Sequence, residues 1–239
     1  MLRNLIFALA APFLMLSLAA EELTLEQAKA EHTAADKLLN VSYAKAKSTL
    51  PEHLFAELQE DQRSWLSYRD YRSLQAAGFD GGAEEGKEKS TVEYWTTLAS
   101  ITEERVRIIE GWMKHDSFAH EWEGIWSDGE GGHLAIFENA EGQFAFTFDV
   151  VRGPTYHVGG IGGNARWNGS SARFSVTSEG EDVETWLTFL KRGIRIEVIG
   201  ENTSPYHGAR AYFDGHYVRV AELTAEDRKA ILANEELNP

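Results

Sequence analysis

The hydrophobic pattern of the chain changes its period near residue 117, and this change limits the possible folds more than any other feature. Before it, apolar residues recur at helical spacing in three segments, 22–49, 51–78 and 90–112. After it, apolar and polar residues alternate over short runs between Gly- and Asn-rich turns. We therefore predict an α+β chain with an N-terminal three-helix antiparallel bundle (21–116), an antiparallel β-barrel or sandwich (117–221), and a short C-terminal helix and tail (222–239).

The boundaries of these elements follow from local signals. Ser90–Glu93 is predicted to cap the third helix, and Thr224 with Asp227 the last one. Hairpin turns are expected at Glu141–Gly142, Asn168–Gly169, Glu179–Gly180 and Arg192–Gly193. The nine expected strands are 122–127, 133–138, 143–150, 155–160, 164–168, 172–177, 185–190, 194–199 and 210–219.

The first twenty residues are predicted to be a secretory signal peptide rather than part of the fold. A basic start, Met1–Arg3, precedes an apolar run from Leu5 to Leu18 and small residues before Glu21. No later stretch is long and apolar enough to span a bilayer. The chain has no cysteine, which excludes disulfides and thiolate chemistry. We expect an exported protein, periplasmic or extracellular, whose cores alone hold the fold.

The chain is acidic, with a net charge of −15, which becomes −16 when Arg3 leaves with the signal. This charge disfavours nucleic acid as a partner. It favours encounter with a basic protein, although excess acid also serves solubility alone. No nucleophile elbow, phosphate loop or paired-histidine metal motif is present, so we expect no cofactor, no metal and no enzymatic activity.

The stretch from Gln62 to Asp70 concentrates unusual residue types on one helix. Gln62, Trp65 and Arg69 fall on one face at helical spacing, and Tyr68 lies beside them. A tryptophan next to an arginine suggests a cation–π contact. Two interpretations stay open: Trp65 as a core anchor with satisfied polar neighbours, or a functional surface.

Three motifs in order resemble the N-terminal domain of the LprI-type lysozyme inhibitors. They are Asp36-x-x-Leu-Asn40-x-x-Tyr43, Gln62-x-x-Trp65-x-x-Tyr68-Arg69-Asp70 and Ile101-Thr-Glu-x-Arg105. The resemblance implies that Asn40, Tyr43, Gln62, Arg69 and Arg105 meet at the helix junction as a polar network that fixes helix register. The second part is similar to β-rich domains that follow this domain in some relatives.

The resemblance implies an exported bacterial envelope protein that binds and blocks a basic lysozyme. The alternative is a non-catalytic binding or scaffold module of the envelope, and a hydrolase is a third possibility. Candidate partner-binding residues in the β part are Arg166 and Trp167 in the loop 159–167, and Tyr206 and His207 in the loop 202–208. The loop 80–89 is a third candidate surface. His157 and His207 could lie close together, but two ligands are too few for structural zinc.

Overall fold

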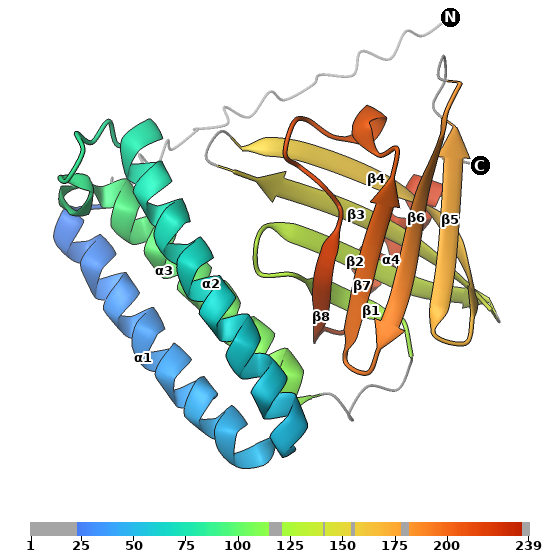
Figure 1. Ribbon diagram of the computed structural model, residues 1–239, viewed down its shortest axis with the longest axis horizontal. Helices are drawn as coiled ribbons and strands as arrows, with labels where there is room; N and C mark the ends of the chain where they lie inside the picture. The colour runs from blue at the N-terminus through green and yellow to red at the C-terminus, as the bar shows by residue number, and fades with distance from the viewer. Residues whose placement is uncertain (1–22, 115–120, 141, 154–155, 178–181, 236–239) are drawn as a thin grey trace, which may run out of the picture.

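The computed structural model describes residues 23–114, 121–140, 142–153, 156–177 and 182–235. The predicted signal peptide, the predicted boundary at residues 116 and 117, and the turns that include Glu141 and Glu179–Gly180 lie outside these residues. Within them the chain forms three long helices, a barrel and a fourth, short helix (Figure 1). The predicted fold class is therefore confirmed, and the choice between barrel and sandwich is settled as a closed barrel.

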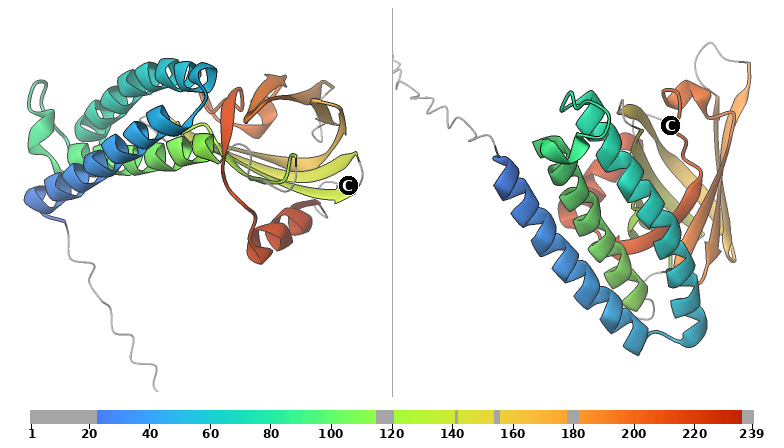
Figure 2. Two further views of the ribbon diagram at one scale, coloured as in Figure 1. Left: turned by 90° about the horizontal axis from the view of Figure 1, so that it is seen from below. Right: turned by 60° about the vertical axis from the view of Figure 1, so that its left-hand side comes forward.

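The helical part consists of α1 (Leu25–Thr49), α2 (Glu52–Phe79) and α3 (Val92–Met113), with a short 3₁₀ turn η1 (Glu88–Ser90) before α3. Helix α3 packs against both α1 and α2 and lies between them in the right-hand view of Figure 2. The N-cap of α3 is Thr91 rather than Ser90: the Thr91 hydroxyl accepts from the Tyr94 amide at 3.3 Å. Ser90 is the last residue of η1, and its hydroxyl donates to the Lys87 carbonyl at 2.7 Å.

The β part is a closed antiparallel barrel in which each strand pairs with the next and β1 pairs with β8. The strands are β1 (Gly124–Ser127), β2 (Gly132–Ala140), β3 (Gln143–Arg152), β4 (His157–Asn168), β5 (Ser171–Thr177), β6 (Glu184–Arg192), β7 (Arg195–Glu201) and β8 (Gly215–Ala221). The contact between β4 and β5 is short and pairs Arg166–Asn168 with Ser171–Arg173.

Strand β4 corrects the predicted strand count. The segments 155–160 and 164–168 were expected to be separate strands, but β4 is continuous and pairs with β3 from Arg152↔His157 to Gln143↔Arg166. Its glycines give room for close neighbours instead of forming a turn. A Cβ on Gly159 would stand 2.5 Å from the His207 Cβ, and one on Gly163 would overlap the Phe174 ring. The last strand, expected at 210–219, is β8 and begins only at Gly215.

Buried aromatic and aliphatic side chains from the strands form a hydrophobic core inside the barrel. Phe144, Phe146 and Phe189 contact one another edge to face, with ring centroids 5.2–6.3 Å apart. Outside the barrel, α4 (Ala225–Glu235) packs on β2, β3 and β4 through Ile231. Its predicted cap is confirmed: the Thr224 amide donates to Asp227 Oδ2 at 2.8 Å, and the Asp227 amide donates to the Thr224 hydroxyl at 3.1 Å.

The helical part and the barrel share a hydrophobic core at α3 and β8. Val218 of β8 packs into the same buried cluster as Ile108, Ile109 and Trp112 of α3. At Gly111 the α3 backbone comes so close to the Arg219 carbonyl of β8 that a Cβ would overlap it. Polar contacts flank this core, including a 2.8 Å hydrogen bond from the Ser127 hydroxyl to Glu104. The helices are thus anchored on the barrel by packing as well as by the connecting chain.

Candidate functional site

Arg105 stands at the centre of the helical part. Its side chain is buried, with 1% of the residue exposed. One guanidinium nitrogen pairs with Asp61 at 2.7 Å, and Nε donates to Gln62 Oε1 at 2.7 Å. Burial lowers the pKa of Arg105, while the Asp61 carboxylate opposes that shift. Because both partners lie on α2, Arg105 ties α3 to α2 in one register.

Trp65 lies directly beside this pair. It is 2% exposed and therefore part of the core. The guanidiniums of Arg105 and Arg69 lie 5.4 and 5.3 Å from the centre of its ring. Arg69 also donates two hydrogen bonds to the neighbouring Asp70, at 2.7 and 2.9 Å. Trp65 at the centre of the second motif is thus buried in the core beside two arginines.

The other two members expected in this network make different contacts. Asn40 donates to the Asp36 carbonyl and carboxylate, at 2.9 and 3.0 Å, and so bonds within α1. The Tyr43 ring packs on Phe55, with centroids 5.4 Å apart. Asp61, and not Asn40, is the residue that pairs with Arg105. The sequence reasoning missed it because an acidic residue on a surface helix is ordinary, and only its distance from Arg105 distinguishes it.

The outer members of the motifs surround a groove between α1 and α2, which we call the motif groove. Its volume is about 340 Å³. It is lined by Asp36, Leu39, Asn40 and Tyr43 from α1 and by Gln59, Gln62, Arg63, Leu66 and Arg69 from α2. A second hollow of about 520 Å³ shares Asp36 and Arg69 with it and continues toward His32 and Tyr94. Of the nine motif residues singled out from the sequence, five line the motif groove, and Asp70 lines the second hollow.

The motif groove contains charged groups of both signs. Asp36 is half-buried, and its carboxylate keeps acceptor capacity beyond the bond from Asn40. Arg63 is exposed at the rim. At the far end, burial lowers the pKa of His32, which therefore favours the neutral imidazole. The groove can accept a cationic side chain at Asp36 and an amide or hydroxyl at Gln59.

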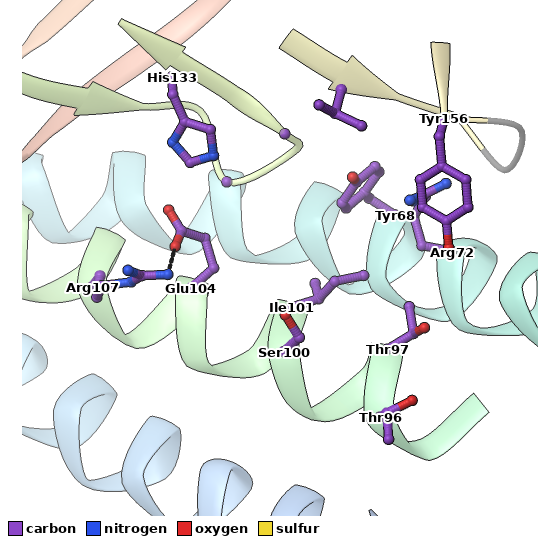
Figure 3. A pocket seen from close by; sticks show the side chains of 13 residues that line it. Tyr68, Arg72, Thr96, Thr97, Ser100, Ile101, Glu104, Arg107, His133 and Tyr156 are labelled. Carbon is purple, nitrogen blue, oxygen red and sulfur yellow. Dashed lines mark ion pairs between the residues drawn. The ribbon is translucent and has the colours of Figure 1, made fainter. Parts of the chain in front are cut away.

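Tyr68 points to the opposite side of α2, into a cleft between the helices and the barrel that we call the interdomain cleft (Figure 3). Its volume is about 490 Å³. Helices α2 and α3 supply Tyr68, Arg72, Thr96, Thr97, Ser100, Ile101, Glu104 and Arg107, and the barrel loops and strands supply Gly129, Gly131, His133, Val151 and Tyr156. Burial raises the pKa of Tyr68 to about 12, so its phenol stays neutral.

The candidate residues of the β part do not form one site. Arg166 is exposed on β4, and Trp167 beside it stacks on Phe144 at 5.8 Å and so covers part of the barrel core. His207 contacts Thr203 and Gly208 through its two ring nitrogens and pairs with Gly159 at the other end of β4. Seven residues of strand separate Gly159 from Arg166, roughly 23 Å at ~3.3 Å per residue. Tyr206 packs against the core near His207.

No metal site is evident in the described part of the chain, where no three histidine or acidic side chains are grouped to hold an ion. His157 lies near Gly208, but His207 already uses both nitrogens in local bonds. Among the described helices, none has the length and apolar character of a membrane span.

These features define a helical module with a structured groove, anchored on a closed barrel with a hydrophobic core. Residues 18–108 match the family model described as lysozyme inhibitor LprI. The match contains all three motifs and covers most of the helical part, which is followed by a β-rich region. A comparison with curated proteins and one with solved structures gave no match.

Proposed function

We propose that this chain is a non-catalytic, exported protein that binds a basic lysozyme and blocks its activity, and that the motif groove is the binding surface. The observation that carries the proposal is the placement of the family motifs. Trp65 and Arg105 hold the bundle together from inside, while Asp36, Asn40 and Arg69 remain at a groove that they jointly line. Motif residues that line a groove rather than fill a core suggest a binding role.

Charge supports the same partner. The chain carries −15 overall, so a cationic lysozyme would be attracted over a Debye length of roughly 10 Å at 0.1 M salt. Asp36 in the groove provides a local acceptor for a lysine or arginine of that partner. Inhibition then requires that the bound chain cover the cleft that holds the catalytic carboxylates of the lysozyme.

A lysis assay tests this function. The chain from Glu21 would be added to a peptidoglycan suspension with a c-type lysozyme, at low and at high salt. We expect dose-dependent protection that weakens as salt rises, because attraction between exposed charges is screened. The tested chain must include the barrel, since α3 shares its core with Val218 of the barrel. Absence of both protection and binding at low salt would reject lysozyme as the partner and leave the scaffold alternative.

A further inference from the structure

The interdomain cleft contains an arginine, Arg72, that has no ion-pair or hydrogen-bond partner among the described residues. Its Nε is buried without an acceptor in the same part of the chain. Its guanidinium lies 5.7 Å from the centre of the Tyr156 ring. A buried N–H donor without a partner is uncommon and costs stability, so such a group suggests an acceptor that comes from outside.

The surroundings of Arg72 differ from those of the other arginines near this cleft. Arg152 pairs with Asp128 at 2.7 Å, and Arg107 pairs with Glu104. Arg72 has no such ion pair among the described residues, and the closest acidic group to its aromatic partner is Asp80, which accepts a hydrogen bond from the Tyr156 hydroxyl. A guanidinium without an ion-pair partner can bind a carboxylate through charge-assisted hydrogen bonds.

The remaining groups of the cleft are hydroxyls and aromatic rings. Thr96, Thr97 and Ser100 form a hydroxyl-bearing stripe on α3 that faces the cleft, and Tyr68 and Tyr156 stand beside Arg72 (Figure 3). The Thr96 hydroxyl already donates to the Val92 carbonyl at 3.1 Å and can still accept, whereas the hydroxyls of Thr97 and Ser100 can donate and accept. The Tyr156 ring is 50% exposed, and its phenol is held by a 2.7 Å hydrogen bond to Asp80, so an apolar face is presented in a fixed position.

We propose that the interdomain cleft binds an acidic sugar, that is, a small ligand with one carboxylate and several hydroxyl groups. Arg72 would bind the carboxylate, the α3 hydroxyls would bind the sugar hydroxyls, and the ring of Tyr156 would pack against the sugar face. The volume of about 490 Å³ lies in the range typical of small-molecule sites. This site is separate from the motif groove, because it lies on the opposite side of α2.

The test is a titration of the full chain with D-glucuronate, followed by NMR chemical-shift changes and calorimetry. Glucose, which lacks the carboxylate, and acetate, which lacks the hydroxyls, are titrated in parallel. We expect glucuronate to bind at least tenfold more tightly than either, with shift changes concentrated at Arg72, Thr97 and Ser100. Equal affinity for glucose or for acetate, no binding of glucuronate, or shift changes elsewhere would each overturn the proposal.

Two arginine variants give the matched control. R72Q should weaken glucuronate binding about tenfold or more, as expected for loss of a charge-assisted hydrogen bond. R173Q should leave it unchanged: Arg173 also lies over an aromatic ring, Trp186 at 4.6 Å, but outside the cleft. Unchanged binding in R72Q, or an equal loss in both variants, would overturn the proposal. If R72Q does not fold, the isosteric T97V variant and the shift map of the native chain decide the question.

Discussion

At the scale of single residues, the helical part depends on an ion pair with unequal exposure. Arg105 is 2% exposed at its side chain, whereas Asp61 is 39% exposed. Removal of either partner breaks the same contact, but the group left behind differs. An abandoned Asp61 can be hydrated, whereas an abandoned Arg105 remains a buried charge without a counter-ion.

This asymmetry predicts different costs for the two truncations. D61N should lower the free energy of unfolding by about 3 kcal/mol, and R105M by about 2 kcal/mol or less, because methionine fills the site without a charge. Urea unfolding of both variants measures this. A larger loss in R105M than in D61N would show that packing by the Arg105 stem matters more than its charge.

Glu130 predicts a pH dependence of stability. Burial and the neighbouring Asp128 raise its pKa above the ordinary value of 4.5, and Arg152 opposes the shift. The folded state therefore holds this proton more tightly than the unfolded state does. Protonation of Glu130 therefore favours the folded state. This contribution to the free energy of unfolding is fully present below pH 4.5 and is lost as the pH rises through the folded-state pKa of Glu130.

Replacement of Glu130 by glutamine keeps a neutral side chain at every pH. E130Q should thus be more stable than the native chain at pH 7 and equally stable near pH 4, as followed by urea midpoints from pH 4 to 7. E85Q, at an exposed loop position, should change nothing at either pH. A destabilised E130Q at pH 7 would mean that the ionised carboxylate is favoured by the fold.

At the scale of elements, the contact between α3 and β8 places the helices on the barrel. At Gly111 the backbone of α3 lies very close to the backbone of β8. A Cβ added at this position would overlap the Arg219 carbonyl. Gly78, near the end of α2, has nothing within 4 Å of the same position. The same substitution should therefore act in opposite directions at the two sites.

G111A is expected to lower the free energy of unfolding by about 1–3 kcal/mol, since β8 must shift to admit the methyl group. G78A is expected to raise it by about 0.5–1 kcal/mol, because alanine is the better helix former. Thermal unfolding of both variants beside the native chain tests the pair. Equal changes in the free energy of unfolding would show that β8 moves easily and that α3 is not packed tightly against it.

The helices and strands also show which parts of the fold could be predicted from the sequence alone. The helices and the cap at Thr224 follow from local spacing and were predicted. The glycines of β4 were interpreted as a turn, because a close approach by Phe174 or His207 depends on residues distant in the sequence. Barrel closure was equally undetermined, since the pairing of β1 with β8 joins the two ends of the sheet.

The two candidate sites also differ in how far the sequence alone could predict them. The motif groove could be anticipated in part, because its lining residues belong to motifs on adjacent helices. The interdomain cleft could not, because Tyr68, Ser100, His133 and Tyr156 come from four separate segments. Only the docking of the barrel on α3 brings these residues together.

At the scale of the whole molecule, the barrel works as a rigid support for the helical module. Its interior contains a hydrophobic core, and Val218 of β8 packs into the core of the helical part. The motif groove lies between α1 and α2, and the barrel meets the bundle at α3 (Figure 1, Figure 2). A large partner can thus reach the groove while the barrel keeps α3 in place.

The central claim, that lysozyme binds at the motif groove, is tested most directly by two charge reversals on α1. D36K changes the charge inside the groove, and E31K makes the same change at an exposed position outside it. Calorimetric titration of a c-type lysozyme into each full-length variant separates local contact from overall charge. We expect D36K to weaken binding at least tenfold relative to E31K, with both variants folded. Equal affinities of D36K and E31K would contradict the account and place the binding surface elsewhere on the molecule.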